Sequence, residues 1–243
     1  MNKKKFISLI DPRFLNGIAH RGLHNEEFTE NGMKAFKNAI DHDLAFEYDI
    51  HLTKDNQLVV CHDEDLKRTT GKEGIIEDLS LKEIRDNYKL LDGGEIPTFQ
   101  EVLDLNAEKV PMVIELKVFR KNYKPLAAKA LEELKQIKDK SKVMIISFDP
   151  RSLWPFKGKG FLRSLLVAKS DEYTWPFKCT VESVDLDQKL FDEKRVQRYY
   201  KRHFVNAWTI EKEEQLDKIL PYVDTVTFQH ISPELIKSKL NNK

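Results

Sequence analysis

The sequence predicts an α/β protein, and within that class an eight-stranded (β/α)₈ barrel of the TIM type. Three observations carry this prediction. Short apolar segments alternate with longer amphipathic segments along the chain, which is typical of βα units around a parallel sheet. The length of 243 residues lies in the range in which such a barrel forms one domain. Charged side chains also interrupt several apolar segments near their ends. We therefore expect one barrel domain over residues 1–243.

The predicted strand Ala45–Leu52 is the most informative segment. Glu47, Asp49 and His51 alternate with apolar residues, so three ionisable side chains line one face of the strand. Such a face costs free energy through like-charge repulsion and desolvation, unless a cation or a substrate lies between the groups. A tight turn follows, and the antiparallel return brings His62 back near the same strand.

The other elements follow from periodicity and from turn residues. A glycine-punctuated stretch at about residues 64–96 is expected to be an insertion folded over one end of the sheet. Because the segment at 181–186 is weakly marked, a doubly wound sheet remains an alternative. Apart from the hairpin return at Leu58–Cys61, the expected strands are Gly17–His20, Ala45–Leu52, Pro111–Lys117, Val143–Phe148, Leu162–Ala168, Val181–Leu186, Phe204–Thr209 and Thr225–Phe228. The expected helices are Gly32–His42, Pro97–Leu105, Tyr123–Lys138, Gln188–Lys201, Lys212–Leu220 and Pro233–Leu240.

Composition limits the binding partners and the cellular compartment that we expect for this protein. Lys and Arg total 41 against 40 for Asp and Glu, and this formal charge of +1 gives no global attraction to nucleic acid or to anionic membranes. Cys61 and Cys179 match no metal-ligand spacing, which favours reduced thiols and a cytoplasmic location. The first apolar run ends at Asp11-Pro12, and no run is long enough to span a bilayer, so we expect neither a signal peptide nor stable membrane insertion. The oligomeric state is not indicated.

Candidate functional residues share one position in the predicted barrel. In a parallel barrel the ends of the strands and the loops that follow them form the catalytic face. We therefore expect one site at that rim. The residues that end or follow predicted strands there are His20, Arg21, Glu47, Asp49, Glu115, Lys117 and Trp208.

An ordered series of motifs resembles the glycerophosphodiester phosphodiesterase family. Each motif alone is weak, but the series covers nearly the whole chain in the order of that family. The motifs are His20-Arg21-Gly22, Glu30-Asn31, Glu47-x-Asp49, Val60-Cys61-His62-Asp63, Arg68-Thr69-Thr70-Gly71, Ile96-Pro97-Thr98-Phe99-x-Glu101-Val102-Leu103, Ile114-Glu115-Leu116-Lys117, Ser147-Phe148-Asp149-Pro150 and Asn206-Ala207-Trp208-Thr209.

The resemblance implies a (β/α)₈ barrel with a small insertion after strand two, one divalent cation, Mg²⁺ or Ca²⁺, and a small-molecule phosphodiester substrate. It implies hydrolysis of glycerophosphodiesters to sn-glycerol 3-phosphate and an alcohol. Carried over residue by residue, the metal ligands are Glu47, Asp49 and Glu115, the catalytic histidines are His20 and His62, and the phosphate-binding residues are Arg21 and Lys117.

The residue types agree with that chemistry. Three carboxylates without a cysteine suit a hard cation. Two histidines that titrate near neutrality can take a proton from the nucleophile and deliver one to the leaving alkoxide. The sequence does not order the acid and the base, and attack by the substrate's own glycerol hydroxyl, giving a cyclic phosphate, uses the same groups. Trp208 either belongs to the core or packs on the substrate's carbon skeleton, and His51 is either a third site imidazole or a supporting one.

The chain departs from the family pattern in three places. Thr29 and Gly32 flank the Glu30-Asn31 pair, where the family has proline and threonine or serine; this pair is either a helix cap or a group that orients the site. After Thr227, where the family has aspartate, the sequence is Phe228-Gln229-His230. Residues 154–182 follow the family only loosely.

Two other functions compete with hydrolysis of glycerophosphodiesters. A phospholipase D-like barrel acting on lysophospholipids or sphingolipids needs an apolar groove beside the site, and Leu153–Phe156 with Trp175–Phe177 are the segments apolar enough to supply one. A non-catalytic barrel that binds phosphate esters predicts that ligands or histidines are missing. All three predicted metal ligands and both predicted histidines are present, so this alternative ranks last.

Overall fold

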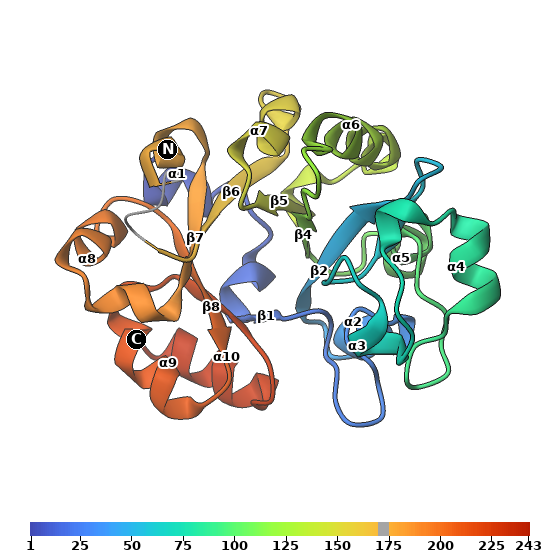
Figure 1. Ribbon diagram of the computed structural model, residues 1–243. Helices are drawn as coiled ribbons and strands as arrows, with labels where there is room; N and C mark the ends of the chain where they lie inside the picture. The colour runs from blue at the N-terminus through green and yellow to red at the C-terminus, as the bar shows by residue number, and fades with distance from the viewer. Residues whose placement is uncertain (170–174) are drawn as a thin grey trace.

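The computed structural model describes residues 1–169 and 175–243, and within them eight parallel strands close into a barrel (Figure 1). Closure follows from β1, which pairs with both β2 and β9. The barrel prediction is confirmed, and the doubly wound alternative is wrong. The strands are β1 (Ile18–Ala19), β2 (Ala45–Leu52), the antiparallel β3 (Leu58–Val60), β4 (Met112–Leu116), β5 (Val143–Ser147), β6 (Leu162–Val167), β7 (Ser183–Asp187), β8 (Val205–Ile210) and β9 (Thr225–Phe228).

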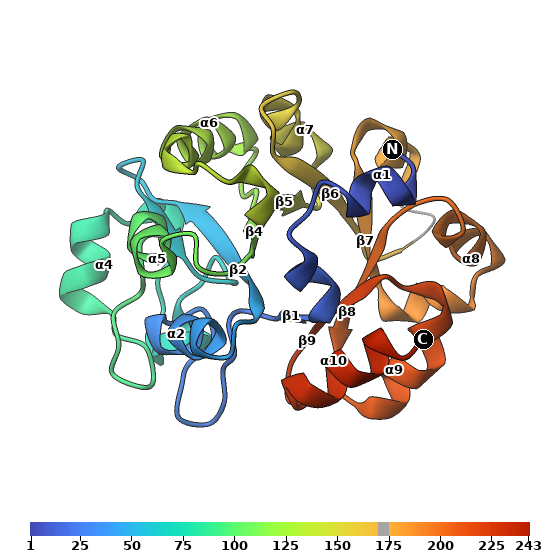
Figure 2. The same ribbon diagram turned by 180° about the vertical axis from the view of Figure 1, so that it is seen from behind.

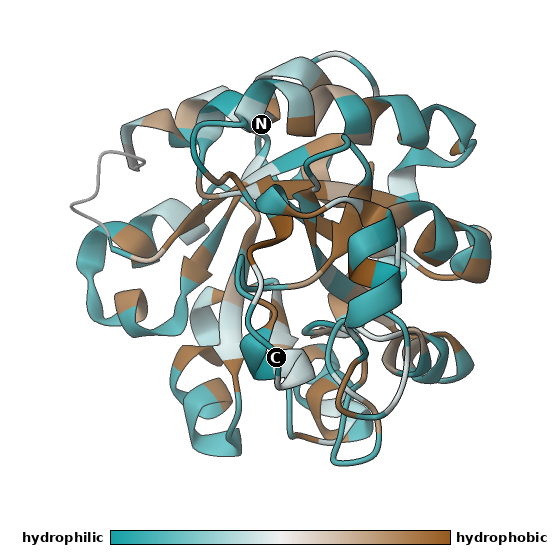
Figure 3. Ribbon diagram, turned by 45° about the vertical axis from the view of Figure 1, so that its right-hand side comes forward, coloured by the Kyte–Doolittle hydropathy of each residue, from teal (hydrophilic) through white to brown (hydrophobic). Residues whose placement is uncertain are grey.

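Helices surround the barrel, with polar residues on their outer faces (Figure 3). The helix expected over Gln188–Lys201 begins only at Lys194, because Asp187 caps a separate 3₁₀ turn over Gln188–Asp192. The helix expected to end at Lys138 ends at Glu133, where a 3₁₀ turn follows. The α-helices are α1 (Lys3–Ile7), α2 (Met33–Asp41), α3 (Lys67–Thr70), α4 (Leu81–Asn87), α5 (Phe99–Asn106), α6 (Tyr123–Glu133), α7 (Pro150–Leu153), α8 (Lys194–Tyr200), α9 (Glu213–Ile219) and α10 (Pro233–Asn241).

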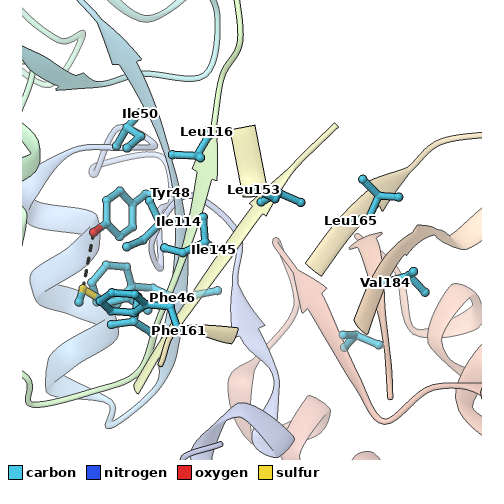
Figure 4. Packing of buried hydrophobic residues seen from close by; sticks show 14 of the residues in the cluster. Phe46, Tyr48, Ile50, Ile114, Leu116, Ile145, Leu153, Phe161, Leu165 and Val184 are labelled. Atoms are coloured by element: carbon cyan, nitrogen blue, oxygen red, sulfur yellow. Dashed lines mark hydrogen bonds between the residues drawn. The ribbon is translucent and has the colours of Figure 1, made fainter. Parts of the chain in front are cut away.

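The outer face of β2 decides which way its charged residues point. Phe46 and Tyr48 pack outward on Phe36 of α2, and Tyr48 also contacts Phe99 of α5 and donates a hydrogen bond to Met112 Sδ at 3.7 Å (Figure 4). Ile50 belongs to the same apolar cluster. Because successive side chains of a strand point to opposite faces, this packing turns Glu47, Asp49 and His51 to the other face. All eight residues of β2 are buried.

The N-terminal segment closes one end of the barrel, which the sequence did not indicate. Phe6, Ile10 and Phe14 are buried in an inner apolar cluster, and the ring of Phe6 stacks on Phe204 with 4.4 Å between centroids. Figure 2 shows this segment crossing the barrel before the chain enters β1. It covers the N-terminal ends of the strands, so a substrate reaches the barrel from the opposite rim.

The insertion between β3 and α5 has its own apolar cluster, which includes Leu66, Ile76, Ile84 and Leu90. It contains α3 and α4 and lies beside β2 (Figure 1). Among the described residues, every helix falls short of the length and apolarity that a membrane-spanning segment needs.

Candidate active site

Three carboxylates meet at the C-terminal rim of the barrel. Glu47 and Asp49 come from β2, and Asp49 lies directly opposite Glu115 of the neighbouring strand β4. Each of the three offers an oxygen within 4.8 Å of the others, and all three side chains are buried. The sequence placed these residues near one another, and the structure brings them together.

This cluster is electrostatically costly without a cation. Burial, and then repulsion from Asp49 and Glu115, raises the pKa of Glu47 well above its ordinary value. Burial also raises the pKa of Glu115 to about 7, against the pull of Lys117. For Asp49, burial opposes ionisation, but the charges of Lys117, His62 and Arg21 lower its pKa.

The carboxylate cluster fits a hard divalent cation. Asp49 Oδ1 is buried and accepts no hydrogen bond, although Lys117 Nζ lies 3.5 Å away. The donor set consists of carboxylate oxygens only, which is the ligand type that Mg²⁺ and Ca²⁺ prefer. A cation there would satisfy the free oxygen and offset the repulsion among the three groups.

Two basic side chains flank the carboxylates. Lys117 Nζ lies 3.0 Å from Glu115 Oε1, and Arg21 Nε lies 3.6 Å from Asp49 Oδ2. Arg21 adopts a left-handed backbone conformation, with φ of 55°, that lets its backbone N–H donate to Glu47 Oε2 at 3.0 Å. Its Nη1 donates to Glu30, but its buried Nε has no hydrogen-bond partner. Arg21 thus presents an unused donor beside the carboxylates.

Both predicted histidines line the same cavity of about 150 Å³ as Arg21, Glu47 and Glu115. His20 follows β1, and its Nε2 lies 4.0 Å from Glu47 Oε2. His62 follows β3, and its Nδ1 lies 2.7 Å from Asp63 Oδ1. Burial lowers the pKa of His20 to about 3 and also lowers the pKa of His62. For His20, burial therefore favours the neutral imidazole, which is the form that accepts a proton.

The Glu30-Asn31 pair orients site groups and does not cap a helix. Asn31 Nδ2 donates to Asp49 Oδ2 at 2.9 Å, whereas Gly32 occupies the N-cap of α2. Glu30 bridges Arg21 to Arg68 of the insertion, and Arg68 also binds Asp63 beside His62. This ion-pair chain links Arg21 to the loop that carries His62.

His51 stabilises the segments that surround the site. Its Nδ1 lies 2.6 Å from Glu77 Oε1, and its Nε2 lies 3.2 Å from the carbonyl oxygen of His62. Both ring nitrogens are thereby engaged in holding the insertion and the loop of His62. Of the two alternatives from the sequence, the supporting role agrees with these contacts.

Trp208 forms part of an apolar wall of the cavity. It lines the cavity with Ile146, Phe148 and Leu166, and the rings of Phe148 and Trp208 meet edge to face at 5.6 Å. Its indole Nε1 is buried without a hydrogen-bond partner. A carbon skeleton that carries hydroxyl groups matches such a wall.

Asp185 is a cavity residue that lies outside the motifs named in the sequence. It is buried on β7 and lines the same cavity. Its carboxylate accepts hydrogen bonds from Ser164 Oγ at 2.6 Å and from Asn206 Nδ2 at 3.0 Å. Burial raises its pKa to about 6. A polar residue inside a short, weakly apolar strand was the only signal available in the sequence.

We expect Asp185→Asn to stabilise the protein at pH 7. The raised pKa means that Asp185 favours folding below its ordinary pKa and loses that contribution as the pH rises through about 6. An amide keeps both partners, because the Ser164 hydroxyl can rotate to accept a hydrogen bond. The gain in the free energy of unfolding should be about 1–3 kcal/mol at pH 7 and should vanish near pH 4. Urea unfolding at both pH values measures it, and an equal effect at both would contradict the prediction.

Comparisons with known proteins agree with this geometry. The model of the glycerophosphoryl diester phosphodiesterase family matches residues 20–230. A glycerophosphodiester phosphodiesterase of Caldanaerobacter subterraneus subsp. tengcongensis is 31% identical over 216 residues, covering 84% of this chain and 88% of that protein. A lysophospholipase D of Rattus norvegicus is 38% identical over 140 residues, covering 52% of this chain and 43% of that protein.

A similar fold occurs in a solved structure. A phosphodiesterase of Oleispira antarctica, in complex with the product sn-glycerol 3-phosphate, superposes with a TM-score of 0.81 at 24% identity and covers 97% of this chain and 99% of that chain. The family match spans most of the chain and begins at His20, the first residue of the predicted site. The chain therefore belongs to the glycerophosphoryl diester phosphodiesterase family.

Proposed function

We propose that the protein hydrolyses glycerophosphodiesters to sn-glycerol 3-phosphate and an alcohol, with one divalent cation and two histidines. The observation that carries this proposal is the convergence of three buried carboxylates and two imidazoles on one cavity. As a member of a phosphodiesterase family, the chain is an enzyme, a phosphoric diester hydrolase.

Glu47, Asp49 and Glu115 would hold Mg²⁺ or Ca²⁺. When bound, such an ion neutralises the phosphodiester and stabilises the charge that develops on its oxygens. Arg21 orients the phosphate through its free Nε donor, and Lys117 adds a point charge. These residues select an anionic ester over a neutral one.

His20 and His62 exchange protons with the substrate. One imidazole takes the proton of the nucleophile, which is water or the substrate's own glycerol hydroxyl, and the other delivers a proton to the leaving alkoxide. If the glycerol hydroxyl attacks, water then opens the cyclic phosphate. Both rings line the same cavity as Glu47, Glu115 and Arg21, so a phosphodiester bound there lies within reach of both imidazoles. Trp208 packs on the glycerol or head-group carbons.

The substrate preference is tested by comparing glycerophosphocholine with lysophosphatidylcholine, which share the choline head group. We expect kcat/KM to be more than about 10-fold higher for glycerophosphocholine, a difference of about 1.4 kcal/mol. Released choline is measured for both substrates, together with sn-glycerol 3-phosphate from glycerophosphocholine and lysophosphatidic acid from lysophosphatidylcholine. A higher kcat/KM for lysophosphatidylcholine would contradict the proposed substrate.

Lysophospholipid hydrolysis is the second candidate, and one feature favours it. A groove of about 780 Å³ is lined by Trp154, which is 60% exposed, and by Phe177. Asp149 and Arg151 line both this groove and a second one that reaches Glu115 and Lys117. Of the apolar segment expected at 153–156, Leu153 and Phe156 are buried in the core, and the side chain of Trp175 lies outside the described residues. Trp154→Ser should lower turnover of lysophosphatidylcholine only.

The insertion and the barrel act as one unit in this proposal, because Arg68 and Glu77 of residues 64–96 contact Glu30 and His51. We also propose a role in glycerol and lipid metabolism in the cytoplasm. The free thiols of Cys61 and Cys179 agree with a reducing compartment.

A further inference from the structure

Gln229 lies in the loop after the last barrel strand, where the sequence departs from the family pattern. Its backbone N–H donates to the carbonyl of Ile210 at 3.0 Å, which ties this loop to the end of β8. Its side-chain Oε1 lies 2.6 Å from His20 Nδ1. The last loop therefore supplies a polar contact to a site imidazole without the aspartate that the family usually carries.

Glu211 determines which way the amide of Gln229 faces. Gln229 Nε2 donates to Glu211 Oε1 at 2.6 Å. An ionised carboxylate can only accept hydrogen bonds, so the amide NH₂ must face Glu211 and the amide oxygen must face His20. A flipped amide would place its oxygen against the Glu211 carboxylate.

The oriented amide in turn selects one tautomer of His20. An amide oxygen cannot donate, so the His20 nitrogen that contacts it must carry the ring proton. In the neutral ring the proton then lies on Nδ1, and Nε2 has a free lone pair. Nε2 is the nitrogen that lies 4.0 Å from Glu47 Oε2.

We propose that Glu211 and Gln229 are positioning residues that fix His20 in the Nδ1-protonated tautomer, so that Nε2 is presented to the substrate as a proton acceptor. This inference rests on the proposed function, in which His20 exchanges a proton with the substrate. The two site imidazoles are thus oriented by different groups, since a neutral amide holds His20 and the carboxylate of Asp63 holds His62. His24 Nε2 also reaches Gln229 Oε1, at 3.3 Å, and the second lone pair of that oxygen accommodates it.

The tautomer is measured directly by NMR of protein labelled with ¹⁵N-histidine, with the His20 signals assigned from their loss in His20→Ala. We expect the wild-type His20 ring to carry its proton on Nδ1. Gln229→Leu removes the acceptor, and Glu211→Gln lets the amide flip, so both should yield a mixture of tautomers. Each should lower kcat about 10–100-fold, as is usual for residues that orient a site group, with a smaller change in KM.

Exchanging the side chains at positions 211 and 229 distinguishes a positioning role from a general structural effect of the substitutions. In Glu211→Gln/Gln229→Glu the carboxylate faces His20, and the amide at 211 donates to it, so the double variant should regain the Nδ1 proton and most of the wild-type kcat. Glu213→Gln is the matched control, because Glu213 lies in the same segment but pairs with Lys239. It should change neither the tautomer nor kcat.

Two results would overturn the proposal: a proton on Nε2 of His20 in the wild type, or unchanged kcat in both single variants. Failure of the proposed function gives a different result, since full activity of His20→Ala would remove the catalytic role of His20 whatever its tautomer. Circular dichroism and thermal unfolding show whether each variant is folded.

Discussion

Removal of divalent cations with a chelator is expected to lower the hydrolysis of glycerophosphocholine by at least about 10³-fold, equivalent to about 4 kcal/mol. Three buried carboxylates lie within reach of one ion, and nothing else in the described site offsets more than part of their charge. Addition of Mg²⁺ or Ca²⁺ to the stripped protein should restore the rate. Comparison of the two ions over a range of concentrations identifies the one that is used. Full turnover after stripping would contradict a role for the ion.

Glu115→Gln should reproduce this loss of activity. Its folding stability, measured with and without the cation, should show that the loss comes from the cation site. The pKa of Glu115 is raised from 4.5 to about 7, so its contribution to folding is present at low pH and lost as the pH rises through 7. The metal-free variant should therefore be more stable than the metal-free wild type at pH 8. A cation at about 100 times its Kd should stabilise the wild type by about 2.7 kcal/mol, and the variant much less.

Glu133→Gln is the matched control for this substitution. Glu133 is a partly buried glutamate whose pKa is also raised by burial, but it ends α6 outside the barrel. It should leave the response to cations unchanged. If the ion stabilised the wild type and Glu115→Gln equally, Glu115 would not be one of its ligands.

Replacement of either histidine should produce the second large effect. We expect His20→Ala and His62→Ala each to lower kcat about 10²–10⁴-fold, the usual range for a group that transfers a proton in the transition state. Because the two groups act on one reaction, the losses in the double variant should not add fully. Steady-state kinetics with glycerophosphocholine measures each step, and phosphorus NMR of the products detects a cyclic phosphate.

His42→Ala is the control for both histidine variants. His42 ends α2, where its Nδ1 contacts the carbonyl of Asn38, and it does not line the cavity. This variant should keep the wild-type kcat. Retained turnover in His20→Ala/His62→Ala would overturn the assignment of both catalytic histidines.

The start of α7 was readable in the sequence but was not predicted. Asp149 caps the helix and Pro150 occupies its first turn, which are ordinary helix-start signals. Its four residues are too few for helical periodicity to be visible. The N-terminal closure of the barrel was missed for another reason. Phe6, Ile10 and Phe14 are apolar in any fold, and only contact with the barrel interior shows where they pack.

The amino-acid sequence by itself determined the strand alternation of β2, the carboxylates and histidines at strand ends, and the order of motifs that indicates the family. These features depend on neighbours along the chain, so local geometry is enough to predict them. Only the tertiary structure decided that Gln229 meets His20 and that Asp185 lines the cavity. Contacts between residues some two hundred positions apart depend on barrel closure and on side-chain rotamers, and neither is encoded in a local pattern.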